Sequence, residues 1–174
     1  FIKKASDTEQ IAKSISSNKG IYLVPAFTGL GAPYWDVNAR GILTGLTRDT
    51  GPKEITRATV ESVAYQTYDL FEAMKHDGLR PKIVKVDGGM VMNNWFSQFL
   101  SDIINVKVLR PKVQETTAAG AAFMAGLYIG VYKSLKDISK NWHLDKKFSP
   151  KMNSKTRNIL IKGWSTAIKR TLIN

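Results

Sequence analysis

A chain of 174 residues, 43% of them hydrophobic, can form one domain or a large part of one, and this composition excludes a disordered protein. The absence of cysteine excludes a disulfide framework, a thiolate metal site and a cysteine nucleophile, and it fits a reducing, cytoplasmic location. His76 and His143 are too few and too far apart in sequence to suggest a metal site.

The formal net charge of +12 is concentrated towards one end of the chain. Residues 133–174 contain eleven Lys and Arg but only two Asp, and therefore carry nine of the twelve net positive charges. A basic face can bind nucleic acid or an anionic membrane. Here the lysines are spaced singly on helical patterns without a nucleic-acid motif, so we predict a solvated face and do not expect nucleic acid as a partner.

In the first half of the chain, hydrophobic spacing predicts helices on either side of two short strands. The predicted elements are one or two short helices over residues 1–17, strands over 21–24 and 39–46, and the longest helix over 53–75. Pro52 suits the start of the long helix, and Asp77-Gly78 is typical of its end.

Residues 26–36 form a long glycine-bearing loop between the two predicted strands. Such a loop inside a compact domain usually has a function. It carries three aromatic rings, those of Phe27, Tyr34 and Trp35. We expect these rings to anchor the loop on the body of the protein rather than to contact a ligand.

The second half of the chain is predicted to alternate strands and helices. The predicted elements are a buried strand over 83–86, a helix over 90–100, a strand over 106–109, a helix over 118–132, a short helix over 134–142 and a last helix beginning at Asn153 or Ser154. The uncharged helix over 118–132, capped by Thr116 or Thr117, is shorter than the roughly 20 residues that cross a bilayer. We expect its small residues to let it lie close against the sheet or a ligand. The alternation indicates an α/β sheet with crossover helices.

A glycine turn, Asp87-Gly88-Gly89, separates the third predicted strand from its helix. Two adjacent glycines without Cβ atoms let a flat ligand lie directly on the backbone. The unpaired N–H groups of the next helix's first turn attract negative or polar ligand edges. This arrangement suggests nucleotide binding, although a Gly-Gly pair after a strand is also common as a simple tight turn.

Three segments match the pattern of a known family. Residues 41–46 (GILTGL), followed after seven residues by 54–61 (EITRATVE), resemble the second signature of the carbohydrate kinases. The loop over 25–36 (PAFTGLGAPYWD) is similar to that of the glycerol kinases rather than the xylulose or gluconate kinases. From about residue 21 to 170, the chain therefore resembles the C-terminal domain of the glycerol kinases, which share the actin and hexokinase fold.

The resemblance implies a fold. It is an α/β, ribonuclease-H-like C-terminal lobe of an actin- or hexokinase-like ATPase, with a mixed sheet and flanking helices. Residues 1–174 are expected to be this nucleotide-binding lobe, incomplete at its N-terminal side and without the catalytic N-terminal lobe. The isolated sheet would then have an unpaired edge.

The resemblance also implies an activity, the ATP-dependent phosphorylation of glycerol to sn-glycerol 3-phosphate by the parent enzyme. ATP or ADP and Mg²⁺ are the implied cofactors, with Mg²⁺ held mainly by the nucleotide and the missing lobe. In the family the second glycine of the turn and the Asn four residues later line the nucleotide; here these are Gly89 and Asn93. No catalytic residue carries over, because those residues precede the stretch that matches Phe1, so the chain alone is expected to be inactive.

Other assignments stay open at this point. Asp87 either caps the turn or contacts phosphate or Mg²⁺. We interpret Asp36 and Arg40 as a loop salt bridge rather than as catalytic groups. We interpret Glu61 as a charge on the surface of the long helix. The alternatives to a glycerol kinase are the lobe of a pentulose or gluconate kinase and a non-catalytic basic binding module. The parent enzyme is expected to be a homo-oligomer, because the family often self-associates.

Overall fold

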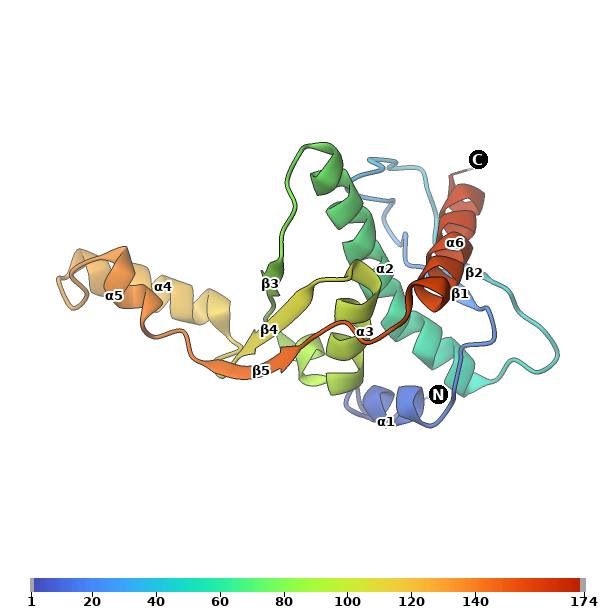
Figure 1. Cartoon of the computed structure of the whole chain (residues 1–174), viewed down its shortest axis with the longest axis horizontal. Coiled ribbons are helices and arrows are strands. Elements are labelled where there is room, and N and C mark those ends of the chain that lie inside the picture. The colour runs from blue at the N-terminus through green and yellow to red at the C-terminus, as the bar shows by residue number, and fades with distance from the viewer. Residues whose placement is uncertain (1, 173–174) are drawn as a thin grey trace.

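Short strands alternate with helices along the chain, and the computed structural model describes residues 2–172 (Figure 1). In chain order the elements are α1 (Asp7–Lys13), β1 (Tyr22–Val24), β2 (Ile42–Thr44), α2 (Pro52–His76), β3 (Ile83–Lys85), the 3₁₀ helix η1 (Gly89–Met92), α3 (Asn94–Ile104), β4 (Lys107–Pro111), α4 (Thr116–Tyr128), α5 (Leu135–Ser139), β5 (Leu144–Phe148) and α6 (Ser154–Thr171).

The strands form two separate sheets. β1 and β2 pair antiparallel, with Leu23 opposite Leu43. In the second sheet β4 lies in the centre, parallel to β3 and antiparallel to β5. The β3–α3–β4 unit is a parallel pair joined by a crossover helix, as the sequence pattern predicts, and the sheet is mixed.

Two predictions about this second sheet were wrong. The strand over 83–86 is an edge strand rather than a buried one, and Ile83 is 52% exposed. β5 was not predicted, because three of its five residues are charged and its strand pattern is therefore weak. Phe148 ends this strand and is buried.

The core lies where α2, α3, α6 and β1 meet. Tyr65 on α2 stacks on Trp164 of α6, with ring centroids 5.3 Å apart, and meets Phe99 of α3 edge to face at 5.6 Å. Tyr22 of β1 completes the cluster at 5.7 Å from the Tyr65 ring. Aromatic contacts at these distances add to the burial of apolar area, so this cluster fixes how the three helices pack.

Buried carboxylates on α2 accompany the aromatic cluster. Glu61 is 1% exposed, accepts a hydrogen bond from Arg57 Nε at 2.8 Å, and also accepts from the Asn18 side chain. Its interpretation as a helix surface charge was therefore wrong. The expected loop salt bridge is also not formed: Asp36 accepts from the backbone N–H of Asn38 and Ala39 instead.

The glycine-bearing loop meets the core through one of its three rings. Tyr34 packs against the core. Phe27 is 78% exposed and Trp35 is 76% exposed, so the expected packing of these two rings was wrong. The loop is thus anchored by the buried Ala26 and Leu30 as well as by Tyr34, and it presents two rings to solvent.

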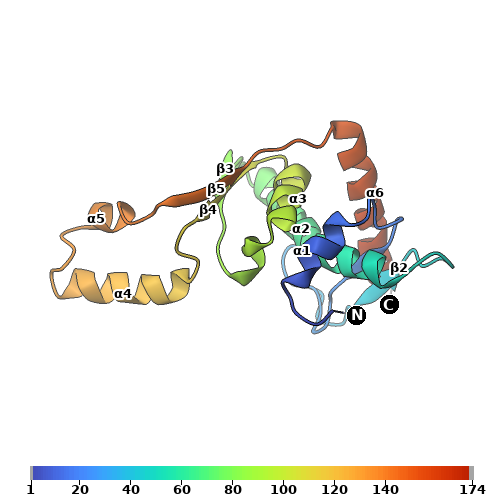
Figure 2. The same ribbon diagram turned by 90° about the horizontal axis from the view of Figure 1, so that it is seen from below.

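Helices α4 and α5 form an arm that extends away from the other helices (Figures 1 and 2). Only Gly126 of α4 is buried, and it lies against the Tyr132 ring. Tyr128 is 92% exposed and Ile129 is 71% exposed. The expected close packing of α4 on the sheet was wrong, whereas the alternative, that its small residues lie against a ligand, stays a prediction. Its N-cap is Glu115 rather than a threonine. No helix among residues 2–172 is both long and apolar enough to cross a membrane.

We predict that Gly163→Ala destabilises the protein, although alanine favours helices. A Cβ at Gly163 would come within 2.2 Å of Tyr22 Oη. Tyr22 is 8% exposed and its hydroxyl donates to the Leu160 carbonyl oxygen at 3.1 Å, so the ring cannot move aside freely. Overpacking of this kind costs about 1–3 kcal/mol, which urea unfolding will measure. The exposed control Ser165→Ala should change stability by less than about 0.5 kcal/mol, and equal stability of the two variants would contradict this packing.

We predict that the stability contributed by two buried carboxyls falls as the pH rises from about 4 to about 6. Burial raises the pKa of Asp69 from 3.8 to about 6, and that of Glu61 from 4.5 to about 6. The folded state therefore holds these protons more tightly than the unfolded state does, and stability is lost as they dissociate. Asp69→Asn keeps an acceptor for the Trp164 indole N–H and removes one titration. Its melting temperature should vary less with pH than that of the wild type or of the exposed control Asp49→Asn, and an unchanged profile would rule the effect out.

Candidate functional site

The two glycines after β3 have different structural roles. Gly88 has a φ of 84°, in the left-handed region that favours glycine, and its N–H donates to the Gln114 carbonyl oxygen at 3.2 Å. Gly89 is not among the positive-φ glycines, and a Cβ added to it would meet no atom within 4 Å. The turn requires Gly88, whereas nothing in the protein itself requires Gly89. The bare backbone of Gly89 instead faces open space that a ligand can occupy.

Asn93 connects the turn to α3. The predicted helix over 90–100 was wrong in its first turn: η1 ends at Met92, and Asn93 is extended, with φ −67° and ψ 106°. Its Oδ1 accepts a hydrogen bond from the Phe96 N–H at 2.9 Å and so caps α3. An Asn side chain that caps α3 in this way prevents η1 and α3 from forming one continuous helix. One of the N–H groups that we expected to be free for a ligand is therefore occupied.

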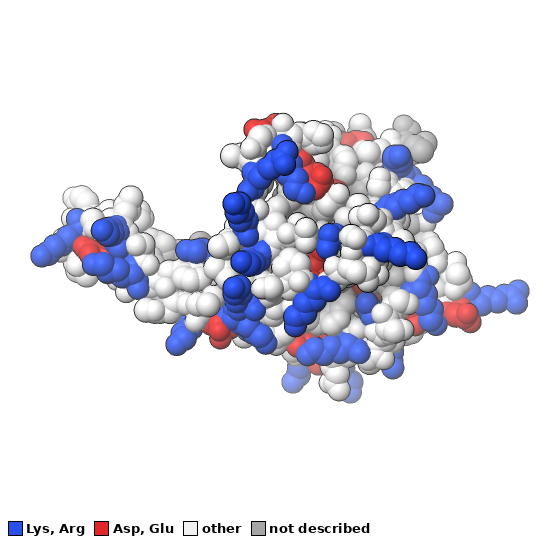
Figure 3. Space-filling view, in the orientation of Figure 1, with Lys and Arg blue, Asp and Glu red and all other residues white. Residues whose placement is uncertain are grey.

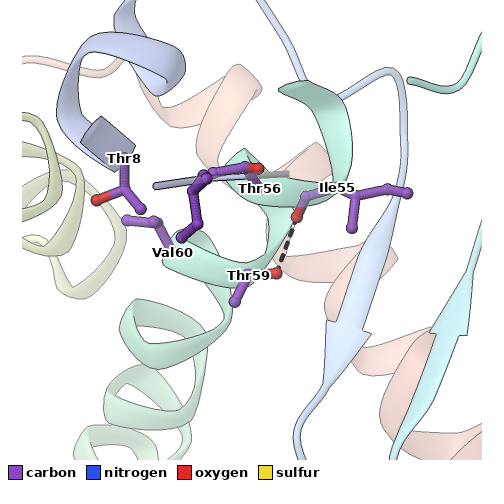
Figure 4. A pocket seen from close by; sticks show the side chains of 6 residues that line it. Thr8, Ile55, Thr56, Thr59 and Val60 are labelled. Atoms are coloured by element: carbon purple, nitrogen blue, oxygen red, sulfur yellow. Dashed lines mark hydrogen bonds between the residues drawn. The ribbon is translucent and has the colours of Figure 1, made fainter. Parts of the chain in front are cut away.

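Gly89 and Asn93 both line a cavity of about 720 Å³. Its other walls come from α1 and α2, and its lining includes Thr8, Val60 and Met90. A second hollow of about 250 Å³ adjoins it, where Thr8 of α1 faces Val60 of α2 (Figure 4). The cavity is mainly apolar, with bare backbone and one amide side chain, a combination that suits a flat ligand with polar edges.

Asp87 is exposed and is not among the residues that line this cavity, within the part of the chain that the structure describes. Among residues 2–172, no group of three or more His, Cys, Asp or Glu could hold a metal ion. The cavity therefore offers its own residues for binding and orienting a ligand, and no acid–base pair.

Arg110 holds the turn from the side of the sheet. This β4 residue is 6% exposed and donates from Nη1 to the carbonyl oxygens of Val91 at 2.8 Å and Met92 at 3.3 Å. It also donates to Asn94 Oδ1 at 3.3 Å and pairs with Asp145 of β5 at 2.7 Å. Arg110 was not predicted as a site residue. It lies two residues after Val108 and so on the same face of β4, but the strand predicted over 106–109 ended one residue before it.

Comparison with known proteins places this site in a family. A model of the C-terminal domain of the FGGY family of carbohydrate kinases matches residues 2–128. The chain belongs to this kinase family. Glycerol kinase 1 of Pseudomonas aeruginosa is 54% identical over 170 residues, which are 98% of this chain and 34% of that protein.

Solved structures agree with this family assignment. The crystal structure of Plasmodium falciparum glycerol kinase with ADP matches at a TM-score of 0.87 and 36% identity, over 99% of this chain and 35% of that one. Gluconate kinase from Lactobacillus acidophilus matches at 0.77 and 26% identity, over 97% of this chain and 34% of that one. The actin- and hexokinase-like fold expected for the family is confirmed. The chain spans about a third of the length of these relatives.

The basic residues of this family member do not gather on one helix. Figure 3 shows Lys and Arg in a column beside β3 and β4, and others scattered over the arm and α6. Lys85, Lys107 and Lys147 are exposed, one on each strand of the second sheet, and β-pairing sets Leu109 between Lys85 and Lys147. Of these three, Lys147 belongs to the basic stretch 133–174 that we predicted to be solvated, and it is exposed. That nucleic acid is not a partner stays a prediction.

We predict that Arg110→Met lowers stability by about 3 kcal/mol, because it removes the charged partner of Asp145 and leaves two turn carbonyls without their donor. Urea unfolding measures the loss. The exposed Arg80→Met serves as the control for removing a surface charge and should stay within about 0.5 kcal/mol of the wild type. A loss below about 1 kcal/mol for Arg110→Met would show that the turn does not depend on this side chain.

Proposed function

We propose that this chain forms the adenosine-binding side of a glycerol kinase, an enzyme that transfers the γ-phosphate of ATP to glycerol and produces sn-glycerol 3-phosphate. The observation that carries the proposal is the open space over Gly89, in the same cavity as Asn93. An adenosine lying there would contact bare backbone on one side and an amide donor and acceptor on the other. The likeness to a glycerol kinase crystallised with ADP supports this choice of ligand.

Glycerol is the substrate that the relatives support best. The first similar curated proteins are named glycerol kinases and are 54% identical to this chain, whereas the gluconate and xylulose kinase structures are 26% identical. The loop over residues 25–36 supports the same choice. The lobe of a pentulose or gluconate kinase is therefore the less favoured alternative.

The chain's own residues would bind and orient the nucleotide rather than react. Phosphoryl transfer depends on positioning the attacking oxygen, Mg²⁺ and the γ-phosphate together. The cavity's described residues supply backbone, an amide, hydroxyls and one carboxylate, that of Glu9, which Asn94 and Lys13 already engage. We therefore infer that Mg²⁺ is held mainly by the nucleotide's phosphates and by groups outside this chain. No catalytic residue is assigned here, and the chain alone should not phosphorylate glycerol.

Exposed apolar surface supports the proposal that residues 1–174 are one lobe, incomplete at its N-terminal side. Tyr128, Ile129 and Val131 at the end of α4 are each at least 67% exposed, and β3 leaves one edge of its sheet unpaired. Exposed apolar residues gathered in one place mark a site where another part of a protein packs. We infer that the remaining polypeptide of the parent enzyme covers α4 and the β3 edge. Its homo-oligomeric state and cytoplasmic location stay predictions.

We predict that the purified chain binds Mg²⁺-ADP saturably, with a dissociation constant of about 0.1–1 mM, because half a site supplies only part of the contacts. Gly89→Val places a branched side chain where the adenosine would lie and should weaken binding at least about tenfold. Calorimetry measures both affinities. Gly120→Val is the matched control, because Gly120 also has open space around it but lies on α4, outside this cavity.

Two outcomes would contradict the proposal. A folded chain that binds no ADP, or whose Gly89→Val variant binds it as well as the wild type, does not hold the adenosine at this turn. Phosphorylation of glycerol from ATP by the isolated chain would overturn the inference that the catalytic groups lie elsewhere.

A further inference from the structure

Helix α1 lies across the cavity from the glycine turn and is hydrogen-bonded to it. Asn93 Nδ2 donates to Thr8 Oγ1 at 3.3 Å. The Thr8 hydroxyl in turn donates to the Ala5 carbonyl oxygen at 2.7 Å, so its proton is already used and its oxygen is free to accept. Together with the Phe96 N–H bonded to Asn93 Oδ1, these contacts fix both ends of the amide. One N–H and one lone pair of Asn93 then remain for a ligand.

Glu9 makes the second connection between α1 and the turn. Its carboxylate accepts hydrogen bonds from the Asn94 backbone N–H at 3.1 Å and from Asn94 Nδ2 at 3.3 Å. Burial would raise the pKa of Glu9, but hydrogen bonds from Lys13 and Asn94 outweigh it, and the pKa is lowered from its ordinary value. The carboxylate is thus held ionised against α3. Asn94 Oδ1 accepts from Arg110 and Lys146, so its amide also has a fixed orientation.

We propose that Thr8 and Glu9 are positioning residues of the nucleotide site: they orient the Asn93–Asn94 pair from the α1 side, as Arg110 does from the sheet side. This inference rests on the proposed function. Thr8, Glu9, Gly89 and Asn93 line one cavity, so a ligand over Gly89 meets an amide whose orientation is set before binding. Because the amide is ordered before the ligand binds, less binding free energy is lost in ordering it. Losing this preorganisation weakens the affinity for the ligand without removing any direct contact.

Thr8→Val tests the proposal, because it keeps the side chain's shape and removes the oxygen that accepts from Asn93. We expect Mg²⁺-ADP affinity to fall about three- to tenfold, the size of one lost neutral hydrogen bond, and Thr8→Ser to restore it. A double-mutant cycle with Asn93→Ala separates positioning from general damage to α1. In the Asn93→Ala background, Thr8→Val should change affinity by less than about twofold. Thermal unfolding of every variant is measured in parallel.

The outcomes distinguish this inference from the function on which it rests. If the wild type binds Mg²⁺-ADP and Gly89→Val abolishes binding, but Thr8→Val binds like the wild type, the positioning role is wrong and the proposed function stands. The same conclusion follows if Thr8→Val weakens binding equally with and without the Asn93 side chain. If the folded wild type binds no ADP, the proposed function and this inference both fail.

Discussion

A buried guanidinium determines where the glycine turn lies. Arg110 is enclosed between β4 and η1, and a charged group in such a place is tolerated only if its N–H groups are paired. Its partners are the Asp145 carboxylate on one side and the carbonyl oxygens of Val91 and Met92 on the other. The turn is therefore bound to the sheet through its backbone, while on the cavity side the Asn93 side chain caps α3.

The binding properties of the site come from backbone that no side chain covers. Gly88 is needed for the left-handed turn, while Gly89 faces a space that no side chain fills. Beside it Asn93 is already anchored through both ends of its amide. Bare backbone with a fixed amide suits the flat face and polar edge of a nucleoside, and it supplies no proton transfer. This division agrees with a lobe that binds nucleotide while the reacting groups belong to the rest of the kinase.

Local patterns predicted the parts of the fold that local chemistry decides. The long helix α2 begins at Pro52 and is followed by Gly78 at a φ of 85°, and Asn153 caps α6, as expected. Local patterns gave wrong predictions where contacts between distant parts of the chain determine the structure. The strand β5 forms because β4 offers it a partner, and Glu61 is buried because Arg57 and Asn18 pair with it. Gly89 and Asn93 were predicted as ligand-binding residues from a family motif, whereas Thr8 and Arg110 come to lie near them only in the folded chain, and no motif pointed to them.

The most direct test of the account is a nuclear magnetic resonance titration of the ¹⁵N-labelled chain with Mg²⁺-ADP, which reports each backbone N–H separately. The account predicts that the largest saturable shifts occur in residues 88–93 and at Thr8, with little change on α6. Shifts centred instead on the basic strands around Lys107, or falling away together as salt is raised, would show that ADP binds as a polyanion on the surface. That result would contradict an adenosine site at the glycine turn.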